Sequence, residues 1–137
     1  MYSALFFLFF SQSPGNPQEI TNLLWSFATL GCACPKLCDA VETRAEWLVN
    51  ADNKAQTCSN CVWAFATLGR ASPKLFDAVE ARADWMVKNG QVQEMSNTLW
   101  AFATLGIPCP NLLDAVEARA AWIVANGTPQ GIANTVS

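Results

Sequence analysis

The sequence predicts an all-α fold, an α-solenoid of about three helix-turn-helix repeats of 37–38 residues. Two observations lead to this prediction. Trp25, Trp63 and Trp100 lie 38 and then 37 residues apart, and each begins the same pattern, W-S/A-F-A-T-L-G. Around each tryptophan, apolar residues recur with the period of a helix instead of alternating as in a strand. A fixed period of this length is the sequence signature of a helical repeat array.

The chain divides into an apolar N-terminal segment and a repeat domain. Residues 1–16 contain the apolar run Ala4–Phe10, which has the length of a signal-peptide core but no basic flank. The repeat domain covers residues 17–137, with units predicted at 17–54, 55–91 and 92–128 and a partial fourth at 129–137. Because Ser137 stands where the fourth tryptophan would fall, we expect a fragment of a longer array or an array with a degenerate end.

Each unit is expected to hold two helices. In the first unit, a helix over 18–30 should end at Gly31, because glycine suits the left-handed position after a helix. A second helix, from Pro35 to about Asn50, begins with proline, which the first helical turn tolerates. Ser72 is the expected N-cap of its equivalent in the second unit. The core side of the first helix is predicted to comprise Ile20, Leu23, Leu24, Phe27 and Leu30.

A stripe of amide and small side chains is predicted opposite that core side. On the first helix, Gln18, Asn22, Ser26 and Thr29 fall within roughly 80° of one another. Amides donate and accept hydrogen bonds at once, as contact with base edges requires, so these positions are candidates for reading single-stranded RNA. The alternative is that they suit a tight contact between neighbouring helices. The candidate residues are Gln18, Asn22, Ser26, Gln56, Asn60, Gln93, Asn97 and Asn134, with alanine at positions 64 and 101 in the slot of Ser26.

The tryptophans of the first helices lie on the flank of this stripe. Trp25, Trp63 and Trp100 each follow an asparagine of the stripe by one helical turn. Such rings offer a stacking platform for a base. Such a residue more often packs against the next repeat, and both interpretations stay open.

Composition argues against catalysis. The chain has a net charge of −3 and no histidine, which removes the commonest general base and metal ligand. The second helices carry acidic residues on one flank and Arg44, Arg82 or Arg119 on the other, which predicts weak ion pairs between neighbouring units. Paired catalytic carboxylates would need a cleft, and we expect none on the outer surface of a solenoid. No enzyme activity and no cofactor are therefore expected.

The six cysteines are expected to be reduced. Cys58 and Cys61 form a C-x-x-C, but it lies within a predicted helix and has no second pair or histidine, so no metal is expected. Three of the six, Cys38, Cys58 and Cys61, take slots that hold apolar residues in other units, where cysteine behaves as a small apolar core residue. No apolar run approaches the roughly 20 residues needed to cross a bilayer, so no membrane partner is expected.

The segment Ser96–Gly106 (SNTLWAFATLG), the proline-started helix after it and Gln130–Thr135 (QGIANT) resemble a known group of repeats. They resemble octotricopeptide-type repeats and the related repeats of FAST-kinase-like and RAP-domain proteins. They are also similar to the helical repeat subunits of RNA-editing substrate-binding complexes. This resemblance implies an α-solenoid of mitochondria or chloroplasts that binds single-stranded RNA through its first helices, with other proteins of an RNA-processing complex as further partners. Ser72–Phe76 departs from the Pro-Pro-Pro-Glu-Trp element of octotricopeptide repeats.

A second function, a scaffold for protein partners, fits the same fold, because solenoid surfaces also bind proteins. Low positive charge weighs against RNA, whose phosphates normally supply much of the affinity. The cations expected to be free are Lys36, Lys54, Arg70, Lys74 and Lys88.

Overall fold

A computed structural model describes residues 14–126, which form nine α-helices and no strand, so the all-helical class is confirmed for this part of the chain. Each unit folds into one long helix followed by two short ones. These are α2 (Pro17–Leu30), α3 (Pro35–Thr43) and α4 (Ala45–Ala51); α5 (Ala55–Thr67), α6 (Pro73–Ala81) and α7 (Ala83–Asn89); and α8 (Val92–Leu105), α9 (Pro110–Ala118) and α10 (Ala120–Asn126). The apolar run Ala4–Phe10, the partial fourth unit and Asn134 lie outside the described residues.

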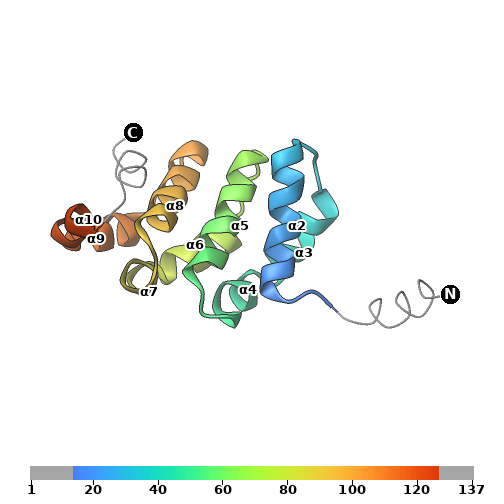
Figure 1. The fold of residues 1–137 in the computed structure, drawn as a ribbon. Coiled ribbons are helices and arrows are strands. Elements are labelled where there is room, and N and C mark those ends of the chain that lie inside the picture. The colour runs from blue at the N-terminus through green and yellow to red at the C-terminus, as the bar shows by residue number, and fades with distance from the viewer. Residues whose placement is uncertain (1–13, 127–137) are drawn as a thin grey trace.

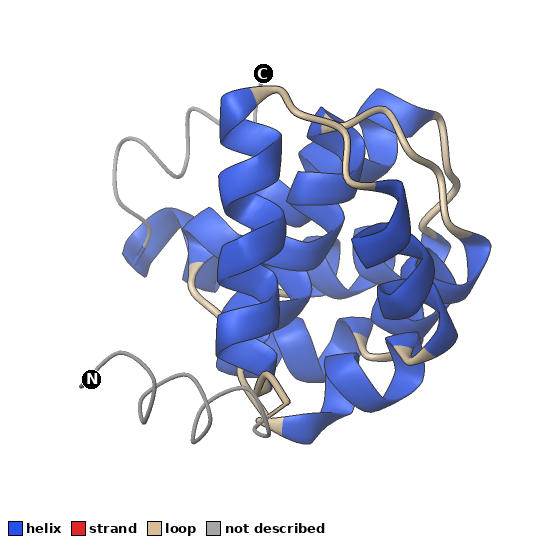
Figure 2. Ribbon diagram, turned by 90° about the vertical axis from the view of Figure 1, so that its right-hand side faces the viewer, coloured by secondary structure: helices blue, strands red, loops and turns tan. Residues whose placement is uncertain are grey.

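The three long helices lie side by side, with α5 between α2 and α8 (Figure 1). The short helices form a second row, in which α4 packs against α6 and α7 packs against α9. Figure 2 shows the same arrangement turned by 90°, with the helices joined by short loops. Neighbouring units therefore contact each other long helix to long helix, and the last short helix of one unit packs against the first short helix of the next.

The predicted helix ends are confirmed where local chemistry specifies them. Gly31 ends α2 and Gly106 ends α8 with φ of 68° and 67°, in the left-handed region that favours glycine. The backbone N–H of Leu75 donates to Oγ of Ser72 over 3.3 Å, so Ser72 is the N-cap of α6. These residues fix where the long helix stops and where the next begins.

The prediction of a single second helix is wrong. In the first unit this segment is interrupted at Arg44, whose φ of −114° and ψ of 23° depart from helical values. Arg82 and Arg119 interrupt the other two units in the same way. At each break the guanidinium carbon lies 3.9–4.4 Å from the ring centre of the tryptophan three residues later. A cation–π contact of this kind is worth about 0.5–2 kcal/mol, so the bend coincides with a stabilising contact.

The core runs between the two rows of helices. Phe76 and Phe102 are buried and meet edge to face, with ring centres 4.8 Å apart. Leu24 is buried as predicted, but Leu23 and Leu30 are 52% and 75% exposed, so their assignment to the core is wrong. Leu23 and Leu30 lie on the side of α2 that corresponds to the side by which α5 packs on the long helix before it. Among the described residues, α2 has no such neighbour.

Candidate functional site

The polar stripe of α2 meets that of α5 in a small depression. Its walls are formed by Gln18, Thr21, Asn22, Lys54, Gln56, Thr57 and Asn60. The depression has a volume of about 20 Å³, which accommodates roughly one water molecule. A ligand as large as a base would therefore contact these amides across the mouth of the depression. The fold thus brings together four predicted site residues from two units and places Lys54 beside them. The four are Gln18, Asn22, Gln56 and Asn60.

The accessibility of the stripe changes along the row. Gln18, Asn22, Ser26 and Gln56 are exposed, whereas Asn60, Gln93 and Asn97 are half-buried. Within α8, Nε2 of Gln93 donates to Oδ1 of Asn97 over 3.0 Å, and in α2 the hydroxyl of Ser26 donates to the carbonyl of Asn22 over 2.9 Å. Asn97 keeps its amide N–H groups for another partner, because only its oxygen is engaged in this bond.

One position of the stripe serves helix packing. Ala64 and Ala101, in the slot of Ser26, are fully buried, so the expectation that this slot lies opposite the core is wrong for α5 and α8. A small residue is required there because neighbouring long helices approach closely. Among the described residues, Ser26 belongs to the first long helix of the row, which explains its exposure. The packing interpretation is therefore correct for this slot.

The three tryptophans of the long helices form a continuous row across the units, called here the tryptophan row. The ring centres of Trp25 and Trp63 are 6.3 Å apart, with 27° between the ring planes. Those of Trp63 and Trp100 are 6.5 Å apart, with 32° between the planes. Trp25 and Trp100 remain almost half exposed, whereas Trp63 between them is more covered. The rings thus pack between units, as one interpretation predicted, and still present aromatic surface beside the amides.

The positive charges are distributed differently from the prediction. Arg70 is not a free cation: Nε donates to Glu42 over 2.7 Å, and Nη2 reaches Asp39, both in the preceding unit. These two carboxylates, Asp39 first, raise the pKa of Arg70 above its usual value. The expected pairing of Arg44, Arg82 and Arg119 with acidic residues is replaced by stacking on tryptophan. Lys54 is the cation that lines the amide depression.

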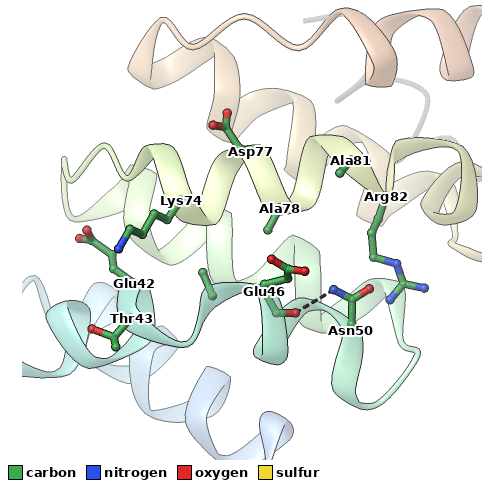
Figure 3. A pocket seen from close by; sticks show the side chains of 10 residues that line it. Glu42, Thr43, Glu46, Asn50, Lys74, Asp77, Ala78, Ala81 and Arg82 are labelled. Carbon is green, nitrogen blue, oxygen red and sulfur yellow. Dashed lines mark hydrogen bonds between the residues drawn. The ribbon is translucent and has the colours of Figure 1, made fainter.

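A second depression lies between the short helices of the first two units (Figure 3). It measures about 690 Å³ and is lined by Glu42, Thr43, Ala45, Glu46, Asn50, Lys74, Asp77, Ala78, Ala81 and Arg82. The expectation that this surface holds no cleft is therefore wrong. Lys74 points toward Glu42 across the opening, and Asn50 Nδ2 donates to the carbonyl of Glu46 over 2.7 Å (Figure 3). Its lining mixes both signs of charge instead of presenting an isolated pair of acids.

The cysteines are free thiols, and five of the six are buried. Burial raises the pKa of Cys38 to about 11 and that of Cys58 to about 12, so both stay protonated near neutral pH. Sγ of Cys34 lies 3.7 Å from Sγ of Cys38. Over residues 14–126, three or more potential metal-ligating side chains never gather in one place. The helices in that range are also too short or too polar to cross a membrane.

Two features of this surface escaped sequence reasoning. The tryptophan row requires knowledge of how α2, α5 and α8 align. The arginine-over-tryptophan contacts had a visible signal, because Arg-x-x-Trp recurs at Arg44, Arg82 and Arg119, yet a pair three apart usually indicates only a shared helix face. The sequence therefore predicts neither the continuous row nor the stacking of arginine on tryptophan.

The fold and this surface define an all-helical protein with a row of long helices that presents amides and stacked indoles. The chain belongs to the RNA-editing substrate-binding complex 6 protein family, whose model matches residues 8–137. The sequence-based resemblance to RNA-editing substrate-binding complex subunits is thereby confirmed. Comparison with curated proteins gave no match.

Proposed function

We propose that the chain is a non-catalytic α-solenoid module that binds single-stranded RNA within a mitochondrial RNA-editing complex. Family membership supports the complex and favours the mitochondrion, while the chloroplast has no support from it. The repeats are proposed to be of the octotricopeptide type. The observation that carries the proposal is the tryptophan row beside the amides of the stripe.

The amides and the indoles supply complementary contacts. A base can stack on an exposed indole, which is worth roughly 1–3 kcal/mol per base, while its edge hydrogen-bonds to a neighbouring amide. Asn22, Asn60 and Asn97 recur once per unit, each one turn before a tryptophan of the row. The proposed sites are therefore spaced with the units, and the described residues would engage about three bases.

Few cations surround this surface. Lys54 lies at the depression between α2 and α5, whereas Arg70 is held by two carboxylates. Phosphate contacts should therefore contribute little, and binding should be weak and depend modestly on salt. Stacking and amide contacts would supply most of the selectivity.

The proposal is tested by selecting RNAs from a random single-stranded pool with the full chain and with Asn22, Asn60 and Asn97 replaced by alanine. A matched control replaces Asn50, Asn89 and Asn111, amide residues of the short helices, by alanine. We expect the first variant to lose the enriched sequences and at least tenfold in affinity, and the control to keep both. Equal enrichment by both variants would overturn base reading by the stripe.

The scaffold alternative has its own support in the mixed-charge depression between the short helices. If the full chain enriches no RNA from the pool, while a protein of the complex co-purifies with it and is lost on Glu46→Lys, the scaffold function is correct and the RNA proposal is wrong.

A further inference from the structure

Apolar side chains are exposed at the end of the row formed by the third unit. Leu113 of α9 and Val124 of α10 are 54% and 71% exposed. Their equivalents in the second unit, Phe76 and Val87, are 0% and 1% exposed, because the third unit packs over them. We call the surface around Leu113 and Val124 the C-terminal end face. It has the composition of a unit-to-unit interface and not that of a polar capping repeat.

The opposite end of the row shows the matching half of that interface. Leu23 and Leu30 are exposed on α2, whereas Cys61, in the slot of Leu23, is fully buried against the preceding unit. Beside them, Ile20, Leu37, Val41 and Trp47 line a depression of about 300 Å³. We call this surface the N-terminal end face. It corresponds to the side by which the second and third units pack on their predecessors.

Polar groups at the two end faces are also complementary. Within the chain, Glu80 accepts hydrogen bonds from the backbone N–H groups of Asn111 and Leu112, over 2.6 and 3.0 Å, at the start of α9. Helix α9 follows Cys109, which provides no side-chain cap. Helix α3 follows Cys34 and has no side-chain cap either, and Glu117 occupies the slot of Glu80 at the C-terminal end face, where it is exposed. The carboxylate of Glu117 at the C-terminal end face thus matches the uncapped start of α3 at the N-terminal end face.

A second match involves the arginines at the helix breaks. Arg82 Nη1 donates to the carbonyl of Val49, in the preceding unit, over 3.1 Å. Arg44 takes the slot of Arg82 at the N-terminal end face, and Val124 takes the slot of Val49 at the other. Apolar contacts, the glutamate and the arginine would all repeat if two molecules were joined end to end.

We propose that the C-terminal end face of one molecule docks on the N-terminal end face of a second copy of this chain, extending the row of units from molecule to molecule. In this arrangement Glu117 of one molecule accepts hydrogen bonds from the backbone at Lys36 and Leu37 of the next. The contact joins two different surfaces, so it forms open chains instead of a closed dimer. The proposal does not depend on RNA binding.

The test uses two variants of the full chain, each blocked at one end. Leu23→Glu places a charge on the N-terminal end face and Leu113→Glu places one on the C-terminal end face. Both positions are exposed, so the helical circular-dichroism spectrum should be unchanged. In sedimentation velocity the unmodified chain should form species that grow with concentration, and each variant alone should be monomeric.

The decisive sample is the mixture of the two variants. Each retains one intact end face, so an equimolar mixture should form a 1:1 dimer and nothing larger. A mixture that remains monomeric overturns the proposal, and so does a variant that still associates by itself. If residues 127–137 or another protein covers the C-terminal end face, the unmodified chain stays monomeric, and the proposal is wrong.

Discussion

Glu80 of the second unit lies at the start of helix α9 in the third, where Oε2 accepts a hydrogen bond from the backbone N–H of Asn111 over 2.6 Å. Oε1 accepts from the next N–H, that of Leu112. Helix α6 caps itself with Ser72, whereas Cys109 takes that slot before α9 and supplies no side-chain acceptor. The glutamate of the neighbouring unit therefore performs the task that serine performs locally.

Removing this carboxylate should destabilise the fold by roughly 1 kcal/mol, the typical value of a lost N-cap. We expect Glu80→Ala to lower the free energy of unfolding in urea by that amount. Adding Cys109→Ser should restore most of the loss, because serine caps the helix as Ser72 does. Asp77→Ala, on the exposed side of the same helix, is the control. Failure of the serine to rescue would show that Glu80 acts by another contact.

The ion pairs of Arg70 should make a small contribution to stability that depends on salt. Arg70 contacts Asp39 and Glu42 of the preceding unit near the surface, where screening by solvent is strong. Arg70→Gln should lower the melting temperature slightly at low ionic strength. The difference should disappear near 1 M NaCl, where the screening length is about 3 Å. A loss that persists in high salt would point to packing by the arginine stem instead.

Alkaline pH should destabilise the protein through its buried thiols. Burial raises the pKa of Cys58 from 9.0 to about 12, so between these values the thiol ionises in the unfolded state and stays protonated in the native one. Each such thiol lowers the free energy of unfolding by up to about 1.4 kcal/mol per pH unit above 9. Urea titrations from pH 8 to 10.5 should show a shallower decline for Cys58→Ala. Cys32→Ala, which removes the exposed thiol, should decline like the unmodified chain.

If RNA binds across the depression between α2 and α5, Lys54 should contribute one phosphate contact. We expect Lys54→Gln to reduce the slope of log affinity against log salt by about 0.7, the value for one phosphate of a single strand. The order of preference among RNA sequences should be unchanged, because a phosphate contact carries no base information. Lys88→Gln on α7 is the matched control. An altered sequence preference in Lys54→Gln would assign the lysine to a base.

Local chemistry made the helix ends predictable, whereas neighbouring units decide what each side chain touches. Gly31 and Ser72 act within their own turn, so their roles follow from residue type. Leu23 and Cys61 share a slot, yet the leucine is exposed and the cysteine buried, since among the described residues a long helix precedes α5 and none precedes α2. No pattern within one unit contains that information.

In the candidate site too, features within one helix were predictable, whereas contacts between units were not. A helical period was enough to place Asn22 and Trp25 on one side of α2. It could not show that Ala64 closes against the neighbouring long helix, nor that Arg70 reaches two carboxylates about 30 residues earlier in the chain. Those facts depend on how the units align.

The tryptophan row has an optical consequence. Its indoles lie 6.3 and 6.5 Å apart, close enough for excitation to pass from one ring to the next before emission. Light absorbed at Trp25 can therefore be emitted from Trp100. A molecule that binds to the long helices and quenches one of these indoles should therefore also lower the fluorescence emission of the other two.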